Sequence, residues 1–263
     1  MSKCPAGDSL EIGAATGLRY GEKGTHTSRT IMLAEVSDLF QHLSPEAARA
    51  DYAQAIVNEN ILAKNTAATR KLTHQRMAEL YGLDPQVAIH RVHRHLWNAD
   101  PAGRPLLALL CCLARDPLLR ATATPVLSLP VGCELPRNAV LIALRQATGD
   151  RINEAVLDKV VRNAASSWTQ SGHLRGRTRK VRQRVDPTFG PAAFAAWLGA
   201  AEQLDGSRLL SSHWTRPLDR SPDALLDLLL QAKQRGLLRA TVGGGVFDID
   251  TTPLDPAHRN HVH

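Results

Sequence analysis

A dense run of cations stands out in the second half of the chain. Residues 173–184 hold six arginine or lysine side chains and no acidic residue. Such groups bind phosphate oxygens, so the run predicts contact with a nucleic-acid backbone. A solvated basic loop is the alternative, but six cations in twelve residues with no counter-charge are uncommon for that role. The cations are Arg175, Arg177, Arg179, Lys180, Arg182 and Arg184.

A helix is expected directly before this run, over residues 153–171. Its apolar side chains recur at helical spacing and form one stripe, made by Leu157, Val160, Val161, Ala164 and Trp168. The opposite face holds no acid and carries Lys159, Arg162, Asn163, Ser166 and Gln170. Arg and Asn are the side chains that best read guanine and adenine edges. A helix, a turn at Gly172 and a basic β-prone segment follow the order of a winged helix, whose wing contacts phosphates.

A second candidate for DNA contact is Pro45–Tyr81, which is expected to form a helix, a short turn and another helix. The second helix begins at Asn65 or Thr66, and its first turns would face a DNA groove if this were a helix-turn-helix. An ordinary helical hairpin with a solvated basic face explains the same pattern, and the pattern alone favours it. The residues that would contact DNA are Thr66, Thr69, Arg70, Lys71 and His74.

Histidines and cysteines do not indicate a metal centre. In the cluster at residues 90–95, His90 and His93 share a helical face, but a zinc site needs a third convergent ligand. The two arginines in this cluster would repel a cation, so we interpret it as a solvated or nucleic-acid-facing basic helix. The four cysteines, Cys4, Cys111, Cys112 and Cys133, form no C-x-x-C pair. The adjacent Cys111 and Cys112 lie in an apolar run and are expected to be small core residues in a reducing compartment.

Motifs of common enzyme classes are missing from the sequence. It contains no phosphate-loop, dinucleotide-binding, nucleophile-elbow or H-E-x-x-H pattern. Acidic residues are scattered and form no cluster suited to two-metal chemistry. We therefore expect a protein without catalytic residues, cofactor, metal or small-molecule substrate.

Composition gives the fold class and the expected compartment. The chain has 263 residues, a net charge of +7 and only 4% aromatic residues. Its abundant Ala and Leu favour helices, so we expect a mainly α protein with short β-hairpins. The longest strongly apolar stretch, Pro105–Ala114, is about half a membrane span, and no signal-peptide pattern is present. The sequence thus predicts a cytoplasmic protein with no membrane partner and a plausible anionic one.

Turn signals and periodicity suggest a domain order. A loosely ordered lead-in over 1–29 precedes a helical domain over 30–120 that contains the helix-turn-helix-like hairpin. Proline and glycine make 121–136 the best linker candidate. A winged-helix-like region over 137–252 and a flexible tail over 253–263 follow. Within that region, a helix near 221–235 and a hairpin around Gly243–Gly245 suggest a second winged unit, which its acidic residues mark as structural or protein-binding.

Residues 59–70, with the stretch 30–35 before them, resemble the BrxA family of small accessory proteins in BREX phage-defence systems. The matching positions are Glu35, Glu59, Asn60, Leu62, Lys64, Thr66, Thr69 and Arg70. The resemblance implies a mostly helical, non-enzymatic DNA-binding protein that works beside a methyltransferase and an ATPase. This chain is longer than the usual member, chiefly at its C-terminal end, so the resemblance assigns no role to residues 187–263.

The sequence therefore favours a protein that binds double-stranded DNA with little intrinsic sequence preference, with other BREX proteins as possible partners. One alternative is an interaction module whose basic surface docks an acidic partner protein. Another is an RNA-binding factor. Base-stacking aromatic residues are nearly absent from the basic segments, which disfavours a platform for single strands.

Overall fold

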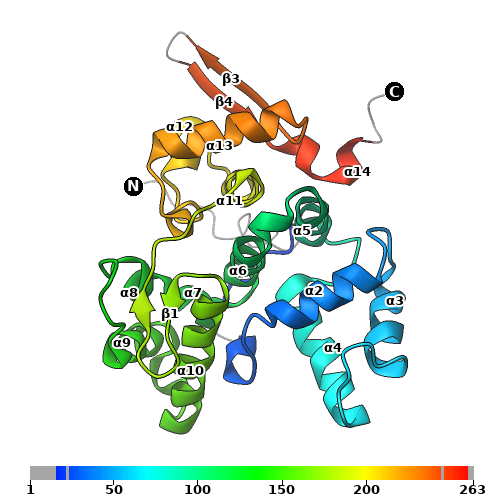
Figure 1. The fold of residues 1–263 in the computed structure, drawn as a ribbon, viewed down its shortest axis with the longest axis vertical. Coiled ribbons are helices and arrows are strands. Elements are labelled where there is room, and N and C mark those ends of the chain that lie inside the picture. The colour runs from blue at the N-terminus through cyan, green and yellow to red at the C-terminus, as the bar shows by residue number, and fades with distance from the viewer. Residues whose placement is uncertain (1–15, 22–23, 244–245, 260–263) are drawn as a thin grey trace, which may run out of the picture. The chain divides into compact units, whose positions relative to one another are not determined.

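The computed structural model describes residues 16–21, 24–243 and 246–259, and it is mainly helical with two short antiparallel hairpins. This confirms the expected fold class (Figure 1). The chain divides into two compact units. Unit 1 comprises 1–19, 86–110 and 186–263, and unit 2 comprises 20–85 and 111–185. Within the described residues, no helix is long and apolar enough to cross a membrane.

These units do not follow the predicted domain boundaries, because each is assembled from segments far apart in the sequence. The predicted linker 121–136 lies inside unit 2, where it contains helix α8 (Ala123–Leu127) and the buried side chain of Val126. The predicted tail is folded as far as it is described. It contains a 3-10 turn, η6 (Thr252–Leu254), and the short helix α14 (Pro256–Arg259). The first fifteen residues of the predicted lead-in, two residues of the glycine turn (244–245) and residues 260–263 lie outside the described residues.

The first part of unit 2 consists of a 3-10 turn and helices with a short π-helical segment. These elements are η1 (Thr25–Thr27), α2 (Leu33–His42), α3 (Arg49–Ala53), η2 (Gln54–Asn58) and α4 (Ala67–Tyr81). Helix α4 begins where the sequence predicts, since the Thr66 hydroxyl accepts a hydrogen bond from the Thr69 amide at 3.1 Å. It ends at Gly82, whose φ of 62° is left-handed.

The second part of unit 2 surrounds the longest helix. Its elements are α7 (Pro117–Ala121), α8, α9 (Arg137–Thr148), η4 (Gly149–Arg151), α10 (Glu154–Gln170), β1 (Leu174–Arg175) and β2 (Val181–Arg182). The predicted apolar stripe of α10 is buried along its whole length. At the end of the stripe, the indole of Trp168 donates a hydrogen bond to the Thr122 hydroxyl at 2.8 Å. Helix α6 (Arg104–Arg115) contributes residues to both units.

Unit 1 is organised around α11 (Phe189–Ala201), a mostly buried helix that packs against α5 (Ala88–Ala99) and α13 (Pro222–Gln234). Asp100 fixes the start of α11, because its carboxylate accepts hydrogen bonds from the Thr188 hydroxyl and from the Gly190 amide at 2.8 Å. The remaining elements are η3 (Pro101–Gly103), α12 (Gly206–Leu210), η5 (Arg216–Leu218), β3 (Arg239–Gly243) and β4 (Val246–Asp250), besides η6 and α14.

Helix α5 corrects one prediction. His90, His93 and Arg94 are buried within unit 1, so this helix is neither a solvated nor a nucleic-acid-facing basic surface. Burial lowers the pKa of His93 to about 3, and the ring is therefore neutral at physiological pH. Arg91 forms two hydrogen bonds of 2.7 and 2.6 Å with the buried carboxylate of Asp255. Among the described residues, no group of three His, Cys, Asp or Glu side chains could hold a metal ion.

Cys111 and Cys112 are buried, as the sequence predicts for core residues, and Cys133 is exposed. Cys4 lies outside the described residues.

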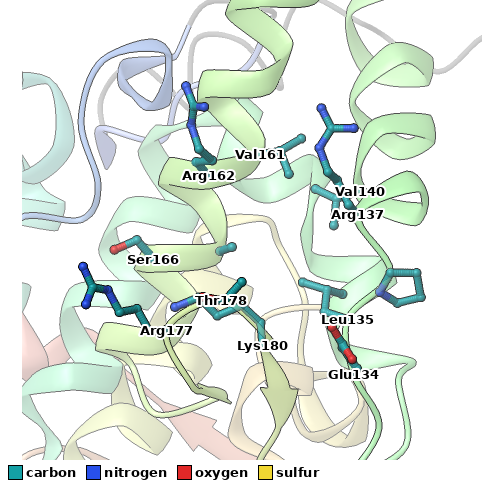
Figure 2. Close-up of a pocket in the computed structure, with 12 residues that line it drawn as sticks. Glu134, Leu135, Arg137, Val140, Val161, Arg162, Ser166, Arg177, Thr178 and Lys180 are labelled. Atoms are coloured by element: carbon teal, nitrogen blue, oxygen red, sulfur yellow. The ribbon is translucent and has the colours of Figure 1, made fainter.

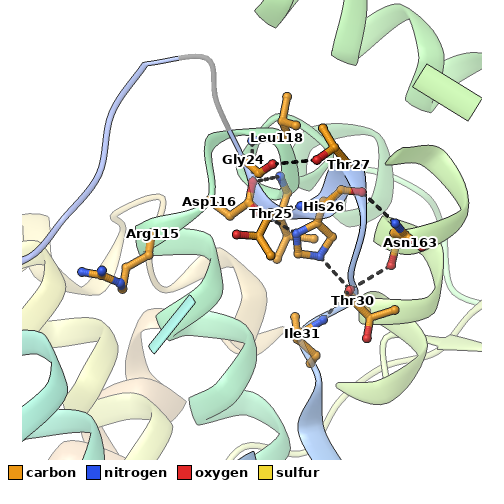
Figure 3. A network of polar contacts seen from close by, with 12 residues as sticks. Gly24, Thr25, His26, Thr27, Thr30, Ile31, Arg115, Asp116, Leu118 and Asn163 are labelled. Atoms are coloured by element: carbon orange, nitrogen blue, oxygen red, sulfur yellow. Dashed lines mark hydrogen bonds and ion pairs between the residues drawn. The ribbon is translucent and has the colours of Figure 1, made fainter. Parts of the chain in front are cut away.

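A buried polar network connects three distant segments of unit 2 (Figure 3). His26 Nδ1 lies 2.7 Å from an oxygen of Asp116, and its Nε2 lies 2.8 Å from the Ser167 hydroxyl. The same Asp116 oxygen accepts the His26 amide at 2.9 Å, while its other oxygen accepts the amides of Leu118 and Leu119 at the start of α7. The carboxylate therefore caps a helix and anchors η1 at once.

We predict that Asp116→Asn lowers the free energy of unfolding by about 3 kcal/mol or more at neutral pH. Asn keeps the size and the capping oxygen but removes the buried charge. Burial alone would raise the pKa of Asp116, but His26 and the surrounding amide donors hold it below its usual value. The stability from this group is thus present above the unfolded value of about 3.9 and is lost as the pH falls through the lower folded-state pKa.

Urea denaturation across a pH series measures this effect. The difference between wild type and Asp116→Asn should be largest near neutrality and should shrink in strong acid. Asp186→Asn is the control, because that carboxylate is 91% exposed and its pairing with Arg220 contributes only about 0–1 kcal/mol. Equal losses for both variants would contradict the role assigned to Asp116.

Candidate nucleic-acid interface

The elements from α9 to β2 have the order of a winged helix. Two helices, α9 and α10, are followed by the antiparallel pair β1–β2, in which Leu174 lies opposite Arg182. On the other edge of β2, Glu134 bridges to Val181. The Leu135 amide also donates to the Lys180 carbonyl at 2.7 Å. The segment just before α9 thus pairs with β2 on the edge that β1 leaves open; this segment, β1, β2 and the turn between them, followed by Gln183 and Arg184, are called the wing below.

The wing turns at Gly176, and the turn requires glycine. Its φ is 112°, and a Cβ atom there would lie 2.0 Å from the Arg179 carbonyl oxygen. Lys180 closes the turn, because its ammonium donates to the Gly176 carbonyl at 2.7 Å and to the Thr169 hydroxyl of α10 at 3.1 Å. The turn is therefore fixed both to itself and to the helix.

An open groove of about 800 Å³ lies between the start of α9, one side of α10 and the turn of the wing. Figure 2 shows Arg162 and Ser166 of α10 above Arg177 of the wing, with Arg137 of α9 on the other side of the groove. Aliphatic side chains line it too, from Leu135, Val140, Val161 and Ala165. Cations from three separate elements therefore surround an apolar floor.

Some cations of α9, α10 and the wing are already paired with acidic side chains, and others are not. The guanidinium of Arg179 lies 2.7 Å from Glu134, and Arg137 forms an ion pair with Asp158. Five other exposed side chains form no ion pair or hydrogen bond with any described residue; they are Lys159, Arg162, Arg175, Arg177 and Arg184. These five carry charge that a phosphate could neutralise without breaking an existing pair.

Arg182 does not belong to the binding surface that the sequence predicts. Its side chain is buried, and the guanidinium donates to the Val126 carbonyl at 3.1 Å and to the Gln183 carbonyl. Side chains alternate along a strand, and here Leu174 and Arg182 face the interior of unit 2. This arginine is structural.

Asn163 is also placed differently from its prediction. Its side-chain amide donates to the His26 carbonyl at 2.8 Å, so it faces the segment 24–33 of the same unit. Gln170 likewise accepts the Leu33 amide, at 3.1 Å. The polar face of α10 thus has two sides. Asn163 and Gln170 lie on the side that contacts segment 24–33. The other side, called the outward line below, carries Lys159, Arg162 and the half-buried Ser166.

The helix-turn-helix-like hairpin offers less charge than its sequence suggests. Arg70 donates to the Val57 carbonyl at 3.0 Å. The hydroxyls of Thr66 and Thr69 lie 2.9 Å apart and complete the start of α4. Burial, followed by the charge of Arg49, lowers the pKa of His74, which favours a neutral ring. Of the five predicted residues, Lys71 alone is an exposed cation that pairs with no described residue.

Two charged side chains that line the groove, Arg137 and Glu134, are not among the residues that the sequence predicts for the binding surface. Arg137 follows Pro136 at the first position of α9, and this helix start is the signal in the sequence that indicates its place. Nothing in the local sequence indicates that Glu134 would pair with β2, because this bridge joins residues 47 positions apart.

We found no matching protein-family model and no significant match among curated proteins.

The contrast between Arg182 and Arg184 gives a matched test of the wing. Arg182→Ala should lower the free energy of unfolding by roughly 2 kcal/mol or more, since it leaves buried carbonyls unpaired. Arg184→Ala removes the same charge from an exposed position and should change stability by at most about 0.5 kcal/mol. Urea denaturation of both variants measures the difference. Similar stabilities for the two variants would refute a structural role for Arg182.

Proposed function

We propose that the chain is a non-enzymatic protein that binds double-stranded DNA through the winged part of unit 2. The observation that carries the proposal is the groove that both Arg162 of α10 and Arg177 of the wing line, where neither arginine pairs with an acidic side chain of the described residues. A lone basic loop would not explain this arrangement, because the cations come from a helix and a hairpin that packing holds together.

In the proposed complex, α10 enters the major groove and the wing contacts the sugar–phosphate backbone. Phosphate contacts position a protein on DNA but carry no base information. The exposed side chains of Lys159, Arg175, Arg177 and Arg184, which pair with no described residue, are suited to phosphate contacts. The outward line of α10 is short, so few side chains can reach a base. Binding should therefore show strong salt dependence and little sequence preference.

The cellular context is a further part of the proposal. The resemblance of residues 59–70 to the BrxA family supports a place among BREX phage-defence proteins, with other components of that system as partners. In the structure, two of these residues, Asn60 and Lys64, stabilise the local fold of unit 2. The Asn60 side chain accepts the Lys64 amide at 2.8 Å, and Lys64 pairs with Glu35 at 3.1 Å.

An acidic partner protein is the second candidate, and the apolar floor of the groove favours it. A peptide with alternating acidic and apolar side chains would bury the latter against Val140 and Val161 while its carboxylates meet the arginines. RNA is the third candidate, and competition between duplex RNA and duplex DNA distinguishes the two.

Replacing Arg175, Arg177 and Arg184 together with Ala should weaken duplex binding on all sequences alike. Each lost phosphate contact changes the slope of log K against log salt by about 0.9, so the slope should flatten by roughly 2–3 if all three touch phosphate. Fluorescence anisotropy with a mixed-sequence duplex at several salt concentrations measures this, with single strands and duplex RNA as competitors.

The control removes three exposed cations from unit 1, by replacing Arg208, Lys233 and Arg239 with Ala. A uniformly basic surface predicts equal effects for the two triple variants, whereas the wing predicts a flattened slope for the first alone. An unchanged slope in the first variant, with its fold intact by circular dichroism, would remove the wing from the DNA surface. Tighter binding to RNA or to an acidic peptide than to duplex DNA would favour those partners.

A further inference from the structure

The two side-chain amides on the polar face of α10 are engaged inside unit 2. Asn163, Ser167 and Gln170 lie at spacings of four and three residues and so form one line along the helix. Asn163 holds the carbonyl of His26, Ser167 accepts the amide of Ile31 at 3.0 Å, and Gln170 accepts the amide of Leu33. This line therefore binds the backbone of residues 26–33.

The outward line of α10 has a different chemistry. Arg162 lies in its middle, with Lys159 one turn before and Ser166 one turn after it. Arg162 is exposed and forms no ion pair or hydrogen bond with a described residue. Figure 2 shows its side chain extending from α10 beside the groove. Its planar fork of donors is therefore available.

Base recognition depends on which of these side chains can reach a base edge. Asn and Gln are the side chains that pair with adenine at N6 and N7, and both such residues on this face are held by the protein backbone. An arginine fork matches the O6 and N7 acceptors of guanine, which lie side by side in the major groove. Lysine presents a compact point charge instead, without a planar fork.

We propose that Arg162 is a specificity-determining residue that gives the protein a preference for guanine at one position of its DNA site. This inference rests on the proposed function, since it requires α10 to lie in the major groove. It adds that α10 reads no adenine, because the segment 26–33 has engaged its amide side chains.

Selection from a pool of randomised duplexes tests the inference. The wild-type protein should enrich guanine at one position, by roughly 5- to 150-fold over other bases. The Arg162→Ala variant should still bind duplexes but lose that enrichment. The control variant, Arg184→Ala, should bind more weakly on all sequences and keep the guanine preference, because it loses a wing cation only.

A second measurement isolates the atoms involved. Replacing the selected guanine by 7-deazaguanine removes the N7 acceptor and should weaken wild-type binding several-fold, while the Arg162→Ala variant should bind both duplexes equally. The inference is overturned if the wild type binds duplexes without enriching guanine, or if Arg162→Ala retains the enrichment; in both cases DNA binding itself stands. Failure of the folded wild-type protein to bind any duplex would overturn the proposed function and this inference together.

Discussion

The contact between His26 and Asp116 is the interaction on which the rest of unit 2 depends. Asp116 starts α7, His26 belongs to the segment before α2, and Ser167 belongs to α10, so one set of hydrogen bonds joins elements up to 141 residues apart. The close approach also explains Gly24, where a Cβ atom would lie 2.1 Å from an Asp116 oxygen. Because η1 packs along α10, this network decides which side of α10 remains outside.

The order of Asp116, His26 and Ser167 resembles the arrangement of a hydrolytic triad, in which a carboxylate orients a histidine and the histidine contacts a serine. Here the three residues are 1%, 0% and 0% exposed, so no substrate carbonyl can reach the hydroxyl. The Ser167 oxygen also lies 2.8 Å from the Asn163 carbonyl and accepts the Ile31 amide. The geometry that activates a nucleophile at an open site serves here to fix a helix and a loop in place.

Local signals in the sequence predict much of the fold. The periodic stripe of α10 and the start of α4 at Thr66 are both found where the sequence places them. Periodicity identifies the face that packs on the core, but it does not tell which flank of the polar face another segment covers. Segment 24–33 has no helical period that would predict where it packs. It packs on α10, so Asn163 contacts this segment inside unit 2 instead of lying on the predicted DNA surface. The burial of Arg182 could not be predicted either, because a two-residue strand gives too little alternation to show which of its side chains face the core.

We propose that the outward line of α10 and the exposed cations of the wing contact duplex DNA. Titration of the protein with a mixed-sequence duplex, followed by the side-chain Nε–Hε signals of its arginines in NMR spectra, tests this claim most directly. We expect the signals of Arg162, Arg175, Arg177 and Arg184 to shift in a salt-dependent way, while that of the buried Arg182 stays in place. Shifts confined to arginines of unit 1, or no shift in any of these four, would contradict it.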